Sequence, residues 1–208
     1  MPPWTAKPIP CQWFRKAGFP MRRGFAGRAG VAMEVDPYGA GRDGSEMNRL
    51  ILMRHGQAEN RATGGDSARR LTAIGAGAAA ETAHQLADAG YAPDRVLVSS
   101  AQRTRETWTA AQPAFPGAKV EFEAALYNAD AETVLDAAEA AEAACVMVVG
   151  HNPGIHDAAM RLLVKDPTPA AAAARLVSGF PTSTAAVFRL NPDGTTTVEA
   201  VILGEARG

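Results

Sequence analysis

The chain has 208 residues, 47% of them apolar, and a formal net charge of −1. This length allows one domain with an appendage, or at most two small domains. The near-zero net charge gives no sign of a nucleic-acid-binding protein, and no apolar run reaches the roughly 18 to 20 residues that a membrane helix needs. We therefore expect no nucleic-acid partner, no membrane span and a cytoplasmic location.

The two cysteines, Cys11 and Cys145, lie far apart in the sequence. Cys145 opens an apolar run, where a cysteine usually acts as a small buried hydrophobic side chain. We expect no disulfide bond between the two, which fits a reducing compartment such as the cytoplasm.

The segment of residues 1–46 differs in composition from the rest of the chain. Proline and glycine are frequent in it, and its basic residues outnumber its acidic ones by seven to four. It shows no sustained helical or strand period, and it lacks the continuous apolar core of a secretory signal. We expect this segment to be disordered. It is either a translated leader upstream of a start at Met47 or an Arg-rich transit peptide, and the folded domain is expected over residues 47–208.

The first predicted strand covers residues 50–54, where four apolar residues lead into Arg54. An apolar run of this length without a polar residue is typical of a parallel strand buried on both faces. The polar residues 59–70 are expected to form an active-site loop. A helix follows, with Thr72 as its N-cap and Gly90 just past its end. Its apolar face is expected at Ile74, Ala78, Thr82, Gln85 and Leu86.

The remaining predicted elements alternate between strands and helices. In chain order they are a strand at 95–98, a helix at 102–112, a short strand at 119–122, a surface helix at 130–143, a strand at 145–149, a helix at 153–164, a loop with an optional short helix at 167–174, and two strands at 183–190 and 195–203 joined by a hairpin turn. This order predicts an α/β fold, namely a three-layer sandwich with a mostly parallel central sheet.

Side chains suited to phosphate follow three of the predicted strands. Arg54 and His55 end the first strand. Arg103 lies on the first turn of the helix after the second strand, and His151 follows the strand at 145–149. The carboxyl ends of parallel strands meet at one edge of a sheet, so these side chains are expected to converge. A guanidinium offers a fork of donors to phosphate oxygens, and a neutral imidazole offers a lone pair that can attack phosphorus.

Four segments of the chain carry a family pattern. They are Leu52-Met53-Arg54-His55-Gly56-Gln57-Ala58, Arg70-Leu71-Thr72-Ala73-Ile74-Gly75, Ser99-Ser100-Ala101-Gln102-Arg103-Thr104-Arg105-Glu106-Thr107 and Val149-Gly150-His151-Asn152-Pro153-Gly154. Through them the chain resembles the histidine phosphatase (phosphoglycerate mutase-like) superfamily and, within it, the SixA-type phosphohistidine phosphatases. The resemblance covers about residues 48–203, and it implies a phosphoglycerate mutase-like fold.

The resemblance also implies the roles of the site residues. It implies that His55 is the nucleophile that takes the phosphoryl group, and that Arg54, Arg103 and His151 hold the phosphate. No metal ion and no cofactor are implied. The substrate-binding set that we expect comprises Arg54, Gly56, Arg70, Arg103, His151 and Asn152. For Arg70 two alternatives stay open, because it either lines the mouth of the pocket or faces solvent.

The chain departs from parts of the family in ways that concern the general acid. Mutase relatives have serine at the position of Ala58, whereas SixA-type members have alanine there as this chain does. Acid-phosphatase relatives have aspartate at the position of Asn152. We find no clear counterpart of the mutases' glutamate proton donor, so Glu59 and Glu123 are the remaining candidates. A phosphoramidate needs less general acid catalysis than an alkyl phosphate, because its leaving imidazole can arrive already protonated.

These observations predict a metal-independent phosphohydrolase that works through a covalent phosphohistidine and removes phosphate from protein phosphohistidine. Its expected partner is a phosphorylated protein, and we expect it to act as a monomer. One alternative is a small-molecule phosphomonoesterase of the same superfamily. The other is an inactive relative that binds phosphorylated ligands.

Overall fold

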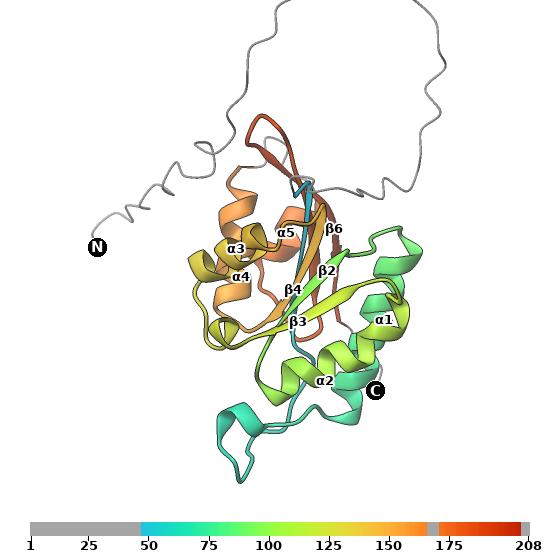
Figure 1. The fold of residues 1–208 in the computed structure, drawn as a ribbon, viewed down its shortest axis with the longest axis vertical. Helices are drawn as coiled ribbons and strands as arrows, with labels where there is room; N and C mark the ends of the chain where they lie inside the picture. The colour runs from blue at the N-terminus through green and yellow to red at the C-terminus, as the bar shows by residue number, and fades with distance from the viewer. Residues whose placement is uncertain (1–46, 166–170, 205–208) are drawn as a thin grey trace, which may run out of the picture. The chain divides into compact units, whose positions relative to one another are not determined.

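A computed structural model describes residues 47–165 and 171–204 of the chain (Figure 1). The segment 1–46 and the first part of the loop predicted at 167–174 lie outside the described residues. The strands are β1 (Arg49–Arg54), β2 (Arg95–Ser99), β3 (Lys119–Glu123), β4 (Cys145–Gly150), β5 (Ala185–Leu190) and β6 (Thr196–Ile202). The α-helices are α1 (Ala73–Asp88), α2 (Gln102–Ala111), α3 (Ala131–Ala140), α4 (Gly154–Leu163) and α5 (Ala171–Val177). The predicted order of strands and helices is confirmed.

The strands form one sheet in the order β3-β2-β4-β1-β5-β6. The pairs β1–β4, β2–β4 and β2–β3 are parallel, whereas β5 pairs antiparallel with both β1 and β6. Helices α1 and α2 lie on one side of this sheet, and α3, α4 and α5 lie on the other (Figure 1). The predicted three-layer sandwich with a mostly parallel sheet and a C-terminal hairpin is therefore confirmed.

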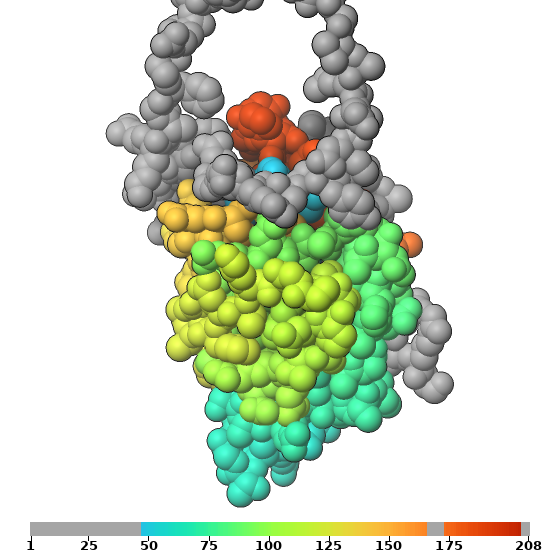
Figure 2. Space-filling view, turned by 45° about the vertical axis from the view of Figure 1, so that its right-hand side comes forward, coloured from blue at the N-terminus to red at the C-terminus, as the bar shows by residue number. Residues whose placement is uncertain are grey.

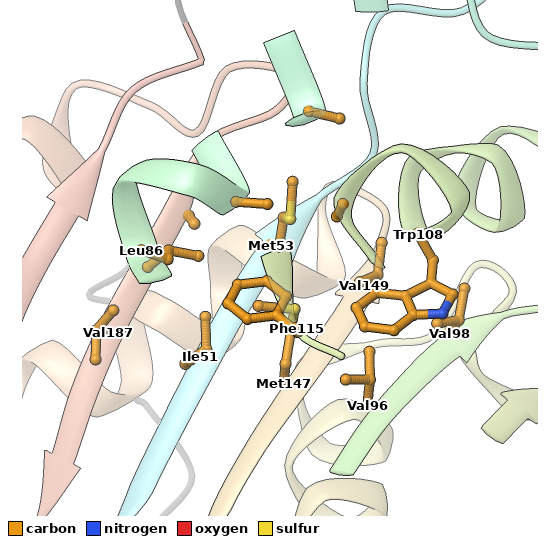
Figure 3. Close-up of a cluster of buried hydrophobic side chains, with 14 of the residues drawn as sticks. Ile51, Met53, Leu86, Val96, Val98, Trp108, Phe115, Met147, Val149 and Val187 are labelled. Carbon is orange, nitrogen blue, oxygen red and sulfur yellow. The ribbon is translucent and has the colours of Figure 1, made fainter. Parts of the chain in front are cut away.

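Strand β1 is buried on both faces, which explains its unbroken apolar run. Ile51 and Met53 join the cluster that also contains Leu86, Trp108 and Phe115, on the side of α1 and α2 (Figure 3). Because side chains alternate along a strand, the neighbours of Ile51 and Met53 point to the opposite face, and Leu50 and Leu52 are likewise fully buried. Cys145 is a free, buried cysteine at the start of β4, as its apolar surroundings predicted.

The chain that leaves β1 packs tightly against the start of α1. The backbone N–H of Gly56 donates to Thr107 Oγ1 on α2 at 3.0 Å, and Thr72 N donates to the Gln57 carbonyl at 3.0 Å. Thr72 Oγ1 caps α1 by accepting from Gly75 N at 3.0 Å. A Cβ atom at Gly56 would lie 2.5 Å from the Gly75 carbonyl oxygen. The residue after His55 is therefore fixed between two helices, at a spacing that only glycine allows.

The predicted apolar face of α1 is partly wrong. Ile74 is 49% exposed, and the buried residues of the helix are Gly75, Ala79, Thr82, Ala83 and Leu86. At Gly75 the helix lies so close to the Gln57 backbone that a larger side chain would not fit. In the described parts of the chain, none of the helices combines the length and apolar character of a membrane span.

We predict that Gly75→Ala lowers the stability of the fold. A Cβ atom at position 75 would lie 2.1 Å from the Gln57 carbonyl oxygen, so the backbone must shift. Overpacking of this kind costs about 1–3 kcal/mol, and each kcal/mol lowers the melting temperature by roughly 2–4 °C in a domain of this size. Thermal unfolding followed by circular dichroism measures the change.

Gly77→Ala is the matched control, because a Cβ at position 77 meets nothing within 4 Å. Replacing a glycine inside a helix by alanine stabilises by roughly 0.5–1 kcal/mol. Equal melting temperatures for the two variants would contradict the close approach of Gly75 to Gln57.

Candidate active site

Two histidines and an arginine lie at the carboxyl edge of the sheet. His55 follows β1, and His151 follows β4, which is the parallel neighbour of β1. The centroids of the two rings are 5.2 Å apart, with the ring planes tilted by 57°. Arg103, on the first turn of α2, is 4% exposed, and the two histidines are 9% and 6% exposed. The structure thus brings together side chains that are separated by almost a hundred residues.

The imidazole of His55 is held in one tautomer. Its Nδ1 lies 2.7 Å from the carbonyl oxygen of Gly56. A carbonyl oxygen can only accept a hydrogen bond, so Nδ1 carries the proton, and Nε2 of the neutral ring keeps its lone pair. Burial, together with the positive charges of Arg103 and Arg54, lowers the pKa of His55 from 6.5 to about 4. At neutral pH, His55 is a neutral imidazole with an available Nε2.

His151 is also buried, and only one of its ring nitrogens has a partner. Nε2 lies 2.8 Å from Ser99 Oγ, at the end of β2. Nδ1 is buried and has no hydrogen-bond partner among the described residues. The Tyr127 ring packs edge-on against the imidazole, with centroids 5.7 Å apart. Burial, together with the interactions with His55 and Arg103, lowers the pKa of His151 to about 3. This imidazole is therefore neutral at neutral pH as well.

Arg54 and Asn152 share one anchor. Arg54 NH1 and Asn152 Nδ2 both donate to the Phe180 carbonyl, at 2.9 and 3.0 Å respectively. Burial lowers the pKa of Arg54, but a guanidinium stays charged in proteins. Arg54 Nε and Asn152 Oδ1 are buried without a partner in the described structure. The Phe180 carbonyl therefore fixes both side chains beside His55 and His151 and leaves polar atoms of each unused.

Asp66 was not predicted as a site residue, yet it binds Arg103 directly. Arg103 NH1 donates to the Asp66 carbonyl oxygen at 2.7 Å, and NH2 donates to Asp66 Oδ2 at 3.0 Å. Tyr127 OH donates to the same carboxylate oxygen at 2.9 Å. The bond from Arg69 is the largest cause that holds the pKa of Asp66 well below its usual range, followed by the bond from Tyr127. Asp66 is thus a permanent carboxylate next to the predicted phosphate ligand.

Little in the sequence indicates the contact between Asp66 and Arg103. Asp66 starts the short 3-10 turn η2 (Asp66–Ala68) inside the loop 59–70, which was predicted only as a polar active-site loop. This loop lies below α2 in the two views of the molecule, where it is drawn in turquoise (Figures 1 and 2). Only the folding of the loop onto α2 brings Asp66 to Arg103. A carboxylate between Gly65 and Ser67 was the one available signal.

Three other predicted residues are exposed or half-buried, unlike the two histidines. Arg70 is exposed, and its Nε donates to Glu106 Oε1 at 2.8 Å. This contact favours the solvent-facing alternative for Arg70. Glu59 Oε2 accepts from the backbone N–H of Arg70 at 3.4 Å, and Glu123 is the last residue of β3. In the described part of the chain, no hydrogen bond joins either glutamate to His55 or His151.

The site is rich in donors and positive charge. Several buried polar atoms have no partner within residues 47–165 and 171–204, among them Arg54 Nε, Arg103 Nε, His151 Nδ1 and Thr184 Oγ1. An unsatisfied buried donor costs about 1–3 kcal/mol, which a bound oxyanion would recover. No group of three or more His, Cys, Asp or Glu among the described residues is placed to hold a metal ion. The arrangement can bind a small oxyanion in front of a neutral imidazole.

We predict that both histidines remain neutral in the folded protein far below the usual pKa of histidine. Because burial lowers the folded-state pKa of His55 to about 4 and that of His151 to about 3, neither ring takes up a proton between pH 6.5 and pH 5. An NMR titration of the imidazole nitrogens measures this directly.

The control is the same titration in urea, where all histidines should titrate near about 6.5. Since the unfolded chain then binds more protons, the folded state loses stability as the pH falls from 6.5 towards 4. A folded-state midpoint near 6.5 for either ring would show that the site is more hydrated than the structure indicates.

Comparison with known proteins gives related sequences and structures. The sequence model of the histidine phosphatase superfamily (branch 1) matches residues 50–144. An uncharacterized chloroplastic protein of Arabidopsis thaliana is 30% identical over 141 residues, which cover 62% of this chain and 65% of that protein. The match thus spans slightly less than two thirds of the plant protein.

Two solved structures are similar over most of the described domain. A putative phosphohistidine phosphatase SixA from Agrobacterium tumefaciens has a TM-score of 0.66 and 35% identity, covering 76% of this chain and 99% of that chain. A protein histidine phosphatase SixA complexed with tungstate has a TM-score of 0.60 and 27% identity, covering 75% and 97%. These likenesses confirm the fold that the sequence resemblance implied.

Proposed function

This chain belongs to the histidine phosphatase superfamily, and we propose that it is a phosphohydrolase in which His55 accepts the phosphoryl group. The hydrogen bond from His55 Nδ1 to the Gly56 carbonyl carries this proposal. It leaves the lone pair on Nε2, in a buried and neutral ring beside two arginines. An imidazole in that state is a nucleophile at neutral pH.

In the first step, His55 Nε2 attacks phosphorus in line with the leaving group. A P–N bond forms, the bond from phosphorus to the leaving group breaks, and the leaving group takes the electron pair. The ring becomes positively charged, and the Gly56 carbonyl stabilises that charge through Nδ1–H. Arg54, Arg103 and His151 bind the oxygens of the transferring group, because electrostatic stabilisation and positioning supply most of the catalysis in phosphoryl transfer.

In the second step, water attacks the phosphorus of the phosphohistidine. The P–N bond breaks, its electrons return to the His55 ring, which becomes a neutral imidazole again, and inorganic phosphate leaves as H₂PO₄⁻ with both protons of the water. The positive charge that other phosphatases obtain from metal ions comes here from Arg54 and Arg103. We therefore propose a reaction that needs no metal ion and no cofactor.

We propose protein phosphohistidine as the substrate. In the described structure neither histidine has an acid within hydrogen-bond distance that could protonate a leaving alkoxide, and Asp66 is held ionised by Arg69 and Tyr127. A phosphoramidate does not need that proton, because its leaving imidazole can be protonated beforehand. The structural relatives named as phosphohistidine phosphatases support the same substrate class.

The other predicted residues receive supporting roles in this proposal. Gly56 supplies the carbonyl that fixes His55, and Asn152 shares the Phe180 carbonyl with Arg54. Arg70, which donates to Glu106 on α2, would contact the body of a large substrate and not its phosphoryl group.

We predict that His55→Ala abolishes turnover but leaves tungstate binding largely intact, because Arg54, Arg103 and His151 remain. Rapid quenching at alkaline pH, which preserves phosphohistidine, followed by peptide mapping, should place the label on His55 of the wild type. The assay is run in excess chelator, in which the wild type should keep its full rate. His84→Ala is the control, since His84 is exposed on α1.

A label on His151, or wild-type turnover in His55→Ala, would overturn the assignment of the nucleophile. Loss of wild-type activity in chelator that one metal restores would overturn metal independence. Intact tungstate binding without any turnover by the wild type would instead favour the inactive phospho-ligand-binding relative.

We predict faster turnover of a phosphohistidine protein than of alkyl phosphates. General acid catalysis contributes about 10²–10⁴ in rate, so its absence should slow the release of an alkoxide by a factor of that order. The measurement compares kcat/KM for a phosphohistidine-containing protein with the values for sugar phosphates, while an aryl phosphate with a good leaving group reports the intrinsic reactivity of the site. Equal or faster turnover of sugar phosphates would favour the small-molecule phosphomonoesterase.

A further inference from the structure

The hydroxyl of Ser99 is the hydrogen-bond partner of His151 Nε2. Ser99 is the last residue of β2 and is fully buried, and its Oγ lies 2.8 Å from His151 Nε2. Its backbone carbonyl accepts a hydrogen bond from Thr104 Oγ1 on α2 at 2.8 Å. The backbone of Ser99 is therefore held by β2 and by α2, the helix that also carries Arg103.

We propose that Ser99 is a positioning residue that fixes His151 as the Nδ1–H tautomer, so that His151 presents a donor to the transferring phosphoryl group. The inference rests on the proposed function and adds a residue to it. Since Ser99 occupies Nε2, Nδ1 is the only nitrogen of His151 that can contact an oxyanion. Whether that contact attracts or repels the oxyanion depends on which nitrogen carries the proton.

The two tautomers of His151 differ in how many buried polar atoms have a hydrogen-bond partner. If His151 carries its proton on Nε2, it donates to Ser99 Oγ, and the Ser99 proton then has no acceptor among the described residues. The buried Nδ1 lone pair is unsatisfied as well. If the proton is on Nδ1, the Ser99 hydroxyl donates to Nε2 and is satisfied. Only Nδ1–H then lacks a partner, and a phosphoryl oxygen would supply it.

The tautomer of His151 matters because the ring is buried and neutral. Burial lowers the pKa of the ring to about 3, so it is neutral at neutral pH and has a single N–H. A protonated ring would donate from both nitrogens, and Ser99 would then be irrelevant. In a neutral ring, the Nε2–H tautomer would point a lone pair at the phosphoryl oxygen. The hydroxyl of Ser99 thus determines whether His151 stabilises the transition state.

The test uses the full chain, with inorganic phosphate and tungstate as probes. Two-bond ¹H–¹⁵N correlation spectra at pH 7 report the tautomer of His151. The wild type should show Nδ1–H both free and with the anion bound. Ser99→Ala should show a mixture of the tautomers when free. Its kcat should fall by about 10- to 100-fold, somewhat less than the 10²–10³ lost when an oxyanion donor is removed outright, with a smaller change in KM.

Two further variants separate positioning from packing. Ser99→Cys keeps a weak donor of similar size and should recover part of the lost rate together with the Nδ1–H signal. Thr109→Ala removes an exposed hydroxyl, bonded to the Arg105 carbonyl on α2, and should leave both tautomer and rate unchanged. Melting temperatures of all variants identify a merely structural effect, which would lower stability without changing the His151 spectrum.

The inference is overturned if His151 of the wild type is the Nε2–H tautomer in the presence of phosphate. It is also overturned if Ser99→Ala keeps both the Nδ1–H signal and the wild-type kcat. If Ser99→Ala does not fold, the wild-type spectrum decides alone. A failure of the proposed function would look different, since the wild type would bind the anion without turning over any phosphorylated substrate.

Discussion

The hydrogen bond between His55 Nδ1 and the Gly56 carbonyl is the constraint on which the rest of the site depends. It decides which ring nitrogen keeps its lone pair, and it requires the Gly56 carbonyl to point at the ring. That carbonyl is held because the N–H of Gly56 donates to Thr107 on α2 and because Gly56 lies against Gly75 on α1. The packing of α1 and α2 against Gly56 therefore determines the tautomer of His55.

Burial and charge act together on the two imidazoles of the site. Burial is the largest cause of the lowered pKa of each ring, and the positive charge of Arg103 contributes to both, so the charge that would attract an oxyanion also disfavours protonation of the two imidazoles. Arg103 is already paired with Asp66 through NH1 and NH2, whereas its Nε is buried without a partner in the described structure. A guanidinium has five N–H donors and two of them bond to Asp66, so donors remain for the oxyanion that the proposed function places here.

Much of the architecture could be predicted because its signals are local. The apolar run before Arg54 indicated a strand buried on both faces, and Thr72 and Gly90 marked the ends of α1 through capping chemistry. The convergence of His55, Arg103 and His151 also followed, since parallel strands bring their carboxyl ends to one edge. The apolar face of α1 was assigned partly wrongly at Ile74, because the close approach of Gly75 to Gln57 depends on a contact between segments and not on helical period.

The sequence by itself determined the fold class, the family resemblance and the residue types gathered at the sheet edge. Helix capping, hydrophobic period and strand order depend on residues that are close together in the sequence. Only the tertiary structure decided the hydrogen-bond partners: Gly56 for His55, Ser99 for His151 and Asp66 for Arg103. Ser99 and His151 are 52 positions apart and Asp66 and Arg103 are 37 apart. A hydrogen bond needs its atoms placed to within a few tenths of an ångström, and such placement arises only when helices, strands and loops pack together.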